Sequence, residues 1–173
     1  ASASLQRLNK YAFYKCTALS TTPDLTGLRF LDESAFEGCT AIKQVTFHKT
    51  LNSIGRYAFK DCSALNTLSF PQEGDVQIGN NAFENCSALS HVEITGAVYS
   101  IGDTAFRNCS ALMSFQLGGQ SSMGTDVLSG CSNVSVTVTD KLLSKAKARR
   151  VPEKWFVIFS VLGGGLGVLS AFY

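Results

Sequence analysis

Apolar residues recur along the chain at a regular spacing. An Ala-Phe pair returns at almost constant intervals, and a cysteine stands three positions after each pair. Another apolar residue precedes each pair, and one follows each cysteine. The pairs are Ala12-Phe13, Ala35-Phe36, Ala58-Phe59, Ala82-Phe83 and Ala105-Phe106, with Val127-Leu128 as a degenerate sixth copy. A repeat whose period falls in the range of roughly 20–50 residues predicts a solenoid in which each unit is one coil.

Two spacings alternate within each unit. The segment Ala-Phe-x-x-Cys has the three-to-four-residue spacing of one helical turn, whereas residues 45–47, 68–70, 92–94 and 115–117 alternate as strands do. One such unit cannot bury its apolar residues alone, so neighbouring units must stack. The predicted fold is an α/β repeat, a leucine-rich-repeat solenoid of about six 23-residue units over residues 1–139. Each unit is expected to hold a short strand and a short helical or 3-10 turn.

The outermost units depart from the pattern. In the first unit, Thr22 and Asp24 occupy the inward strand positions that Val45 and Phe47 fill in the second. In the last unit, Val-Leu replaces Ala-Phe. Terminal units of a repeat array are commonly atypical, so both are interpreted as caps.

One motif is specific enough to suggest a family. The pattern Ile-Gly-x-x-Ala-Phe-x-x-Cys-Ser-Ala-Leu is nearly complete at residues 54–65, 78–89 and 101–112. It resembles the BspA-type (Treponema-type) leucine-rich repeat family over about residues 5–138. The resemblance implies a curved or gently twisted solenoid with a binding role, often at the surface of bacteria or protists. It brings no catalytic residues, because the family shares none.

The outward strand positions are where a repeat solenoid usually binds partners. The candidate concave face consists of small polar residues with no aromatic cluster among them: Gln44, Thr46, Thr67, Ser69, His91, Glu93, Ser114 and Gln116. We expect a protein partner on this face. A solvated face without a partner is the alternative interpretation.

The sequence gives no sign of catalysis, and we expect no catalytic, cofactor-binding or metal-binding residues. Even the two most closely spaced cysteines, Cys109 and Cys131, belong to different repeats, so no Cys-x-x-Cys pair can begin a zinc site. The cysteines are instead expected to be free core residues. His48 and His91 are interpreted as solvated surface residues. No phosphate-binding loop or nucleophile elbow is present in the sequence.

Residues 155–173 carry no charge and are bounded by Trp155 and Tyr173. As a helix they would extend roughly 28 Å, close to the ~30 Å hydrocarbon core of a bilayer. We therefore predict one transmembrane helix at 155–173 that contacts the lipid bilayer. Small residues at steps of three and four predict a face that packs against other membrane helices. They are Ser160, Gly163, Gly164, Gly167, Ser170 and Ala171.

Charge is divided unevenly along the chain. Residues 1–139 carry 9 Lys/Arg against 11 Asp/Glu, whereas the linker 140–154 carries 6 against 2. A basic flank before a span predicts that the repeat domain lies on the inside, in cytoplasm, stroma or matrix. Nucleic-acid binding is not expected, because no aromatic platform is interleaved with these charges. Residues 144–146 and the apolar tail also resemble a GPI-attachment signal, which is a further alternative.

Two functions follow from these features. The main hypothesis is a non-catalytic accessory or scaffold subunit of a larger membrane protein complex, for example in a thylakoid or mitochondrial inner membrane. The start at Ala1 without Met is compatible with removal of a signal or transit peptide. The alternative is a cell-surface adhesion or recognition protein of the BspA-like type.

Overall fold

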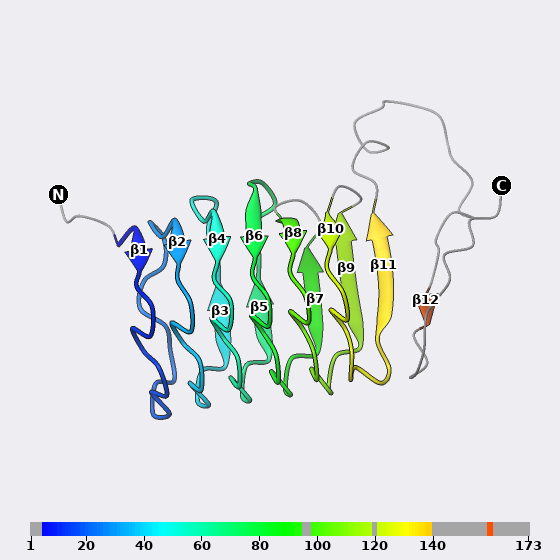
Figure 1. Ribbon diagram of the computed structural model, residues 1–173, viewed down its shortest axis with the longest axis horizontal. Helices are drawn as coiled ribbons and strands as arrows, with labels where there is room; N and C mark the ends of the chain where they lie inside the picture. Colours follow the sequence, from blue (N-terminus) through cyan, green and yellow to red (C-terminus); the bar gives the residue numbers. More distant parts are fainter. Residues whose placement is uncertain (1–4, 95–97, 119–120, 140–158, 161–173) are drawn as a thin grey trace.

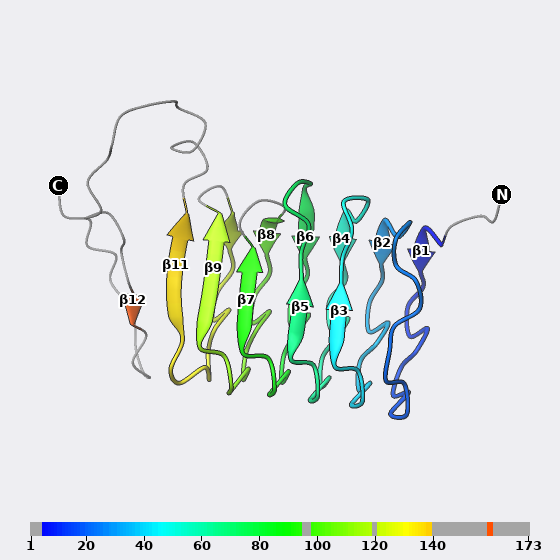
Figure 2. The same cartoon turned by 180° about the vertical axis from the view of Figure 1, so that it is seen from behind.

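Each repeat forms one coil of a parallel β-solenoid, seen from opposite sides in Figures 1 and 2. The computed structural model describes residues 5–94, 98–118, 121–139 and 159–160. One strand from each repeat joins a six-stranded sheet, in which all neighbouring strands are parallel. In order, these strands are β1 (Arg7–Leu8), β2 (Phe30–Leu31), β4 (Ser53–Ile54), β6 (Val76–Ile78), β8 (Val98–Ile101) and β10 (Ser122–Met123).

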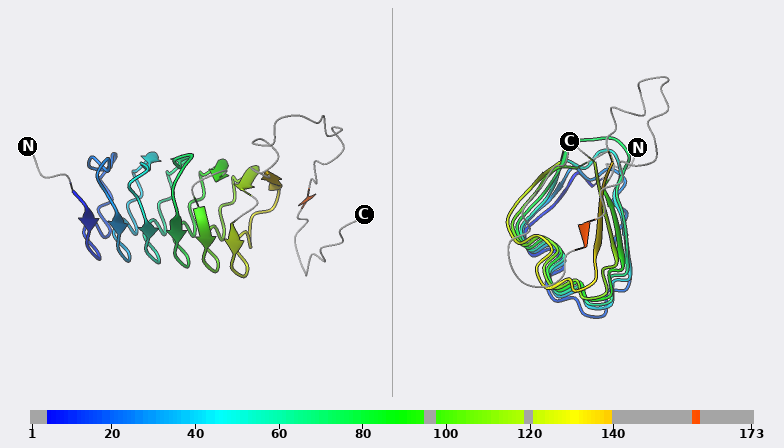
Figure 3. Two further views of the ribbon diagram at one scale, coloured as in Figure 1. Left: turned by 90° about the horizontal axis from the view of Figure 1, so that it is seen from above. Right: turned by 90° about the vertical axis from the view of Figure 1, so that its right-hand side faces the viewer.

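A second row of strands lies on another side of the coils, as the end-on view in Figure 3 shows. Strands β3 (Gln44–Thr46) and β5 (Thr67–Ser69) form one parallel pair. Strands β7 (His91–Ile94), β9 (Ser114–Gly118) and β11 (Ser135–Thr139) form a parallel sheet. The four strands predicted from alternation are confirmed to within a residue or two at each end. Among the described residues of the first repeat no strand occupies this side, as expected for an atypical terminal unit.

The core is built from equivalent residues that stack along the solenoid axis. The phenylalanine of each Ala-Phe pair lies on that of the next repeat: the rings of Phe36 and Phe59 are 5.1 Å apart and tilted by 11°. Similar contacts link Phe13 to Phe36, Phe59 to Phe83 and Phe83 to Phe106, at 5.2, 5.4 and 5.0 Å. Because each ring covers its neighbour, the inner members are fully buried while Phe13 is only partly buried.

The Ala-Phe-x-x-Cys segment is a series of β-turns, and the expected helical or 3-10 turn is wrong for the residues that the structure describes. In each repeat, the residue before the Ala-Phe-type pair and the residue before the cysteine have left-handed backbone. In the third repeat they are Tyr57, with φ of 59°, and Asp61, with φ of 60°. The other five repeats have positive φ at the same two positions. A right-handed helix needs negative φ at consecutive residues, so these positions interrupt it at every fourth residue.

Hydrogen bonds between repeats replace the missing helical bonds. The amide of Phe59 donates to the carbonyl of Ala82 at 2.7 Å, and the amide of Asp61 donates to that of Glu84 at 2.9 Å. Equivalent bonds join every neighbouring pair of repeats along this edge. We call the side of the solenoid that the Ala-Phe-x-x-Cys segments form the turn edge. Its backbone polar groups are hydrogen-bonded to neighbouring repeats, as those of the strands are, so no helix is needed to satisfy them.

The glycine of the Ile-Gly motif allows the repeats to approach closely. A Cβ atom at Gly79 would lie 2.6 Å from the amide nitrogen of Arg56 and 2.8 Å from the carbonyl carbon of Gly55. Gly55, Gly102 and Gly124 are similarly close to the backbone of the preceding repeat. Glycine at this position thus sets how tightly consecutive coils stack.

The cysteines form a ladder inside the turn edge. Five are buried, as expected, and each donates a hydrogen bond from Sγ to the phenylalanine carbonyl of the preceding repeat, at 2.9–3.3 Å. Cys16, in the first repeat, is exposed instead. Burial raises the pKa of the Cys39 thiol to about 11 and the pKa of Cys86 well above its usual range. The buried thiols are consequently poor nucleophiles.

Little of the predicted C-terminal region is described. Phe159–Ser160 forms β12, which pairs antiparallel with β11, and the rest of the predicted linker 140–154 and span 155–173 lies outside the described residues. Within the described residues, no helical segment has the length and apolar composition that spanning a bilayer requires. The division at residues 139 and 154 therefore stays a prediction.

Candidate functional site

The candidate concave-face residues all lie on strands of the second row. In β3 and β5, Gln44 is paired with Thr67 and Thr46 with Ser69, and all four are exposed. In β7 and β9, His91 is paired with Ser114 and Glu93 with Gln116. His91 and Glu93, on β7, are exposed, whereas Ser114 and Gln116, on β9, are half-buried. We call this set of eight residues the polar strand face.

The geometry of the polar strand face follows from alternation within each strand. In β5, Thr67 and Ser69 point outward because Leu68, between them, is buried in the core. Parallel pairing in register then places equivalent outward residues of paired strands about 4.8 Å apart. The result is a rigid surface of small polar side chains that can form hydrogen bonds across a protein interface.

Five of the six predicted helix-packing residues lie outside the described part of the chain. Ser160 lies in β12, while Gly163, Gly164, Gly167, Ser170 and Ala171 lie outside the described residues. Their role as a packing face stays a prediction.

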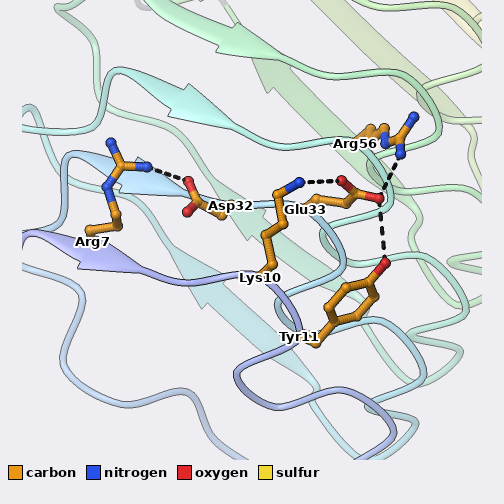
Figure 4. Close-up of polar contacts among 6 residues, drawn as sticks. All are labelled: Arg7, Lys10, Tyr11, Asp32, Glu33 and Arg56. Carbon is orange, nitrogen blue, oxygen red and sulfur yellow. Dashed lines mark hydrogen bonds and ion pairs between the residues drawn. The ribbon is translucent and has the colours of Figure 1, made fainter.

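A second surface lies on the turn edge of the first repeats, where charged residues pair between neighbouring coils. Glu33 accepts from Lys10 Nζ at 3.1 Å and from Arg56 Nη2 at 2.8 Å, so it links three repeats (Figure 4). The hydrogen bonds from Arg56 and Lys10 hold the pKa of the Glu33 carboxyl below its usual range. Arg7 pairs with Asp32 beside this group, at 2.7 Å.

The ion pairs continue into the next repeats. Glu84 is 7% exposed and accepts from Lys60 Nζ and Asn81 Nδ2, both at 3.0 Å. Arg107 lies 4.0 Å from its other oxygen. The hydrogen bond to Glu84 raises the pKa of the Lys60 ammonium. These pairs tie successive repeats together along the surface.

Three tyrosines gather next to these ion pairs and line a shallow pocket. The rings of Tyr11 and Tyr14 are 5.5 Å apart at 89°, and 53% and 40% of these residues are exposed. The pocket also contains residues of the second and third repeats: Glu33, Ser34, Glu37, Tyr57 and Lys60. We call it the tyrosine pocket. It lies on the turn edge, apart from the polar strand face.

Sequence reasoning did not find the tyrosine pocket, although a signal was present. Tyr11 and Tyr57 both stand directly before the Ala-Phe pair of their repeats, and Tyr14 follows Phe13. Aligning the repeats and reading each outward position down the stack places these side chains on one edge. The tyrosines stand outside the strand positions, which were the positions considered for partner binding.

No group of three or more His, Cys, Asp or Glu side chains could hold a metal ion within the part of the chain that the structure describes. Asp24 accepts from the hydroxyl of Thr26 at 2.6 Å and from its amide at 2.9 Å, which lowers the pKa of this carboxyl. His48 lies near it in a shallow pocket with Thr22 and Gln44. The Asp24 carboxylate is thus engaged in hydrogen bonds within its own loop.

Two solved structures resemble this chain. One is a leucine rich cell surface protein from Faecalibacterium prausnitzii A2-165, at 20% identity and a TM-score of 0.45, with 79% of this chain and 52% of that chain covered. The other is a leucine-rich repeat protein from Bacteroides ovatus ATCC 8483, at 16% identity and a TM-score of 0.34, with 81% and 54% covered. The chain thus spans about half the length of each. Comparison with curated proteins gave no significant match.

The sequence matches the family described as BspA type leucine rich repeat region (6 copies) over residues 6–135. The matched region contains all six Ala-Phe-type units and the strands β1 to β10. A repeat solenoid of this kind is suited to protein–protein interaction, because it offers an extended rigid surface. The chain belongs to the BspA-type leucine-rich repeat family.

Proposed function

We propose that this protein is a non-catalytic recognition protein of the cell surface, which binds another protein through its polar strand face. The observation that carries the proposal is the in-register array of outward polar side chains on neighbouring parallel strands. Family membership supports a binding role and favours a surface location.

Substitutions on the β3–β5 pair and on the six-stranded sheet test this role. Thr46 and Ser69 are exposed neighbours on β3 and β5, so the double variant Thr46→Arg/Ser69→Arg places two bulky cations on the half of the face that these strands form. Gln77→Arg is the matched control, because Gln77 is also exposed but lies on β6 in the six-stranded sheet. A partner recovered with the parent chain should be retained by Gln77→Arg and lost by the double variant. Equal retention by both variants would refute binding through this face.

The location is tested by protease treatment of intact cells. A surface protein should lose its repeat domain to protease added from outside. Protection of the domain in intact cells, with cleavage only after lysis, would contradict the surface location and agree with the inside orientation that the basic linker 140–154 predicts.

The second candidate is an accessory subunit of a larger membrane complex, supported by the uncharged span 155–173 and its stripe of small residues. Extraction in mild detergent, followed by size separation, tests it. Co-migration with a large complex that Gly163→Leu/Gly167→Leu abolishes would support the subunit. A small particle that the double variant leaves unchanged would remove this candidate.

A further inference from the structure

The tyrosine pocket exists only because the repeats stack. Tyr11 and Tyr14 come from the first repeat, Glu33 and Glu37 from the second, and Tyr57 from the third. Inter-repeat bonds hold the three segments side by side: the amide of Tyr11 donates to the Glu33 carbonyl at 3.1 Å, and that of Ser34 donates to the Arg56 carbonyl at 3.0 Å. The pocket is therefore preformed by the solenoid.

Its walls are aromatic and open to solvent. The perpendicular rings of Tyr11 and Tyr14 make a corner with two apolar surfaces, and both residues are at least 40% exposed. Exposed tyrosines offer a large apolar face with little side-chain entropy to lose on binding. The hollow measures about 270 Å³, just below the ~300–1,000 Å³ of pockets that enclose drug-sized ligands. This space suits one ring of a larger molecule.

The polar groups around the rings have mixed charge. Glu33 is already compensated by Lys10 and Arg56. Among the described residues, the Glu37 carboxylate has neither a hydrogen bond nor an ion pair, and its charge attracts the ammonium of Lys60. On the other side, Lys60 Nζ uses one of its three donors on Glu84 and lies 5.4 Å from the ring centre of Tyr57. The pocket thus offers free acceptors and free donors together.

The charges around the pocket balance one another. Glu33 is paired with Lys10 and Arg56, and Lys60 is paired with Glu84 and attracted by Glu37, so a ligand with a net charge would meet no excess of opposite charge. A neutral group with hydroxyls can donate to Glu37 and accept from Lys60 while its C–H surface lies on a tyrosine ring. We propose that the tyrosine pocket binds one sugar ring of a neutral glycan.

The direct test uses the full 173-residue chain with fluorotyrosine at its five tyrosines, observed by ¹⁹F NMR. The probes are maltohexaose, N-acetylglucosamine hexamer, xylohexaose and mannohexaose, added up to ~10 mM because a single-ring site is expected to have a Kd on the order of 1 mM. Tyrosine-to-phenylalanine variants assign the signals. Tyr11, Tyr14 and Tyr57 should shift together and saturably with at least one of these sugars. Failure of all four to shift these signals would overturn the proposal.

Variants and charged probes complete the test. Tyr14→Ala and Glu37→Gln should each weaken the affinity for the sugar roughly fivefold to tenfold, because the first removes a ring contact and the second a charged hydrogen-bond acceptor. Met113→Ala should leave the affinity unchanged, since Met113 is 55% exposed in the fifth repeat, away from the pocket. Binding of hexalysine or a heparin oligosaccharide in place of the neutral sugars would overturn the proposal. Since the polar strand face is elsewhere, this result is independent of protein binding by that face.

Discussion

The Sγ of Cys86 donates a hydrogen bond to the carbonyl oxygen of Phe59, one repeat earlier, at 3.2 Å. Both groups are buried, so neither has water as an alternative partner. The bond places each thiol of the ladder against the backbone of its neighbour. Reactivity at these cysteines consequently reports whether the repeats are stacked.

Thiol labelling should separate one cysteine from the other five. In the native chain, Cys16 is exposed and should react quickly with an alkylating reagent at neutral pH, while the five buried thiols should react only when the solenoid opens. Mass spectrometry of a labelling time course measures this. Cys16→Ser should abolish the fast phase, and several fast thiols in the native parent chain would contradict the stacked ladder.

The phenylalanine stack should be most sensitive in its interior. Phe83→Ala removes a fully buried ring that lies between Phe59 and Phe106, and should lower the free energy of unfolding by about 3–5 kcal/mol. Phe13→Ala should cost clearly less, because Phe13 has one stacked neighbour and is only partly buried. Denaturant unfolding of both variants compares them, and equal losses would contradict this account of the core.

Gly79→Ala should force two repeats apart. The new Cβ would lie 2.6 Å from the backbone nitrogen of Arg56, which is not a flexible side-chain end. Overpacking of this kind typically costs about 1–3 kcal/mol, and we expect a loss in that range from thermal or denaturant unfolding. Gln77→Ala, at an exposed position of the same strand region, is the control and should change stability by less than ~0.5 kcal/mol. If Gly79→Ala were as stable as this control, the close approach of the two repeats at Gly79 would be unimportant for the stability of the fold.

The Glu33 ion pairs should stabilise the fold in a pH-dependent way. The folded pKa of Glu33 is lowered by Arg56 and Lys10, so its contribution is present above the ordinary value of 4.5 and is lost as pH falls through the folded pKa. The parent chain should therefore melt above Glu33→Gln at pH 7, and the difference should shrink below about pH 4.5. Glu73→Gln, at an exposed glutamate outside the ion pairs, is the control. A difference that is constant with pH would contradict the assignment.

The repeat and its buried positions could be predicted from sequence because one constraint acts six times. Each copy confirms which positions face inward, so Phe59 and Leu68 could be assigned to the core from their spacing alone. The family follows from the same pattern. The exposure of Cys16 could not be read from that pattern, because the repeat places it in the same position as the buried cysteines.

The turn edge was harder to predict. A spacing of three to four residues fits both a helical turn and a pair of β-turns, and backbone dihedral angles distinguish them. Tyr57 and Asp61 adopt positive φ although neither is glycine, which local propensity does not indicate. The tyrosine pocket was missed for a related reason: its walls come from separate repeats, and their proximity depends on the edge that they share.

Alternate amides of the turn edge point toward the following repeat, as that of Phe36 does toward the carbonyl of Ala58. A repeat therefore offers the same pattern of acceptors to the repeat before it and of donors to the repeat after it. Removal of residues 55–78 would join Ile54 to Gly79, recreating an Ile-Gly junction between two compatible surfaces. The number of repeats in this architecture can therefore change without disturbing how they stack. Genetic duplication or loss of one period preserves every junction and alters only which side chains, such as the three tyrosines, become neighbours.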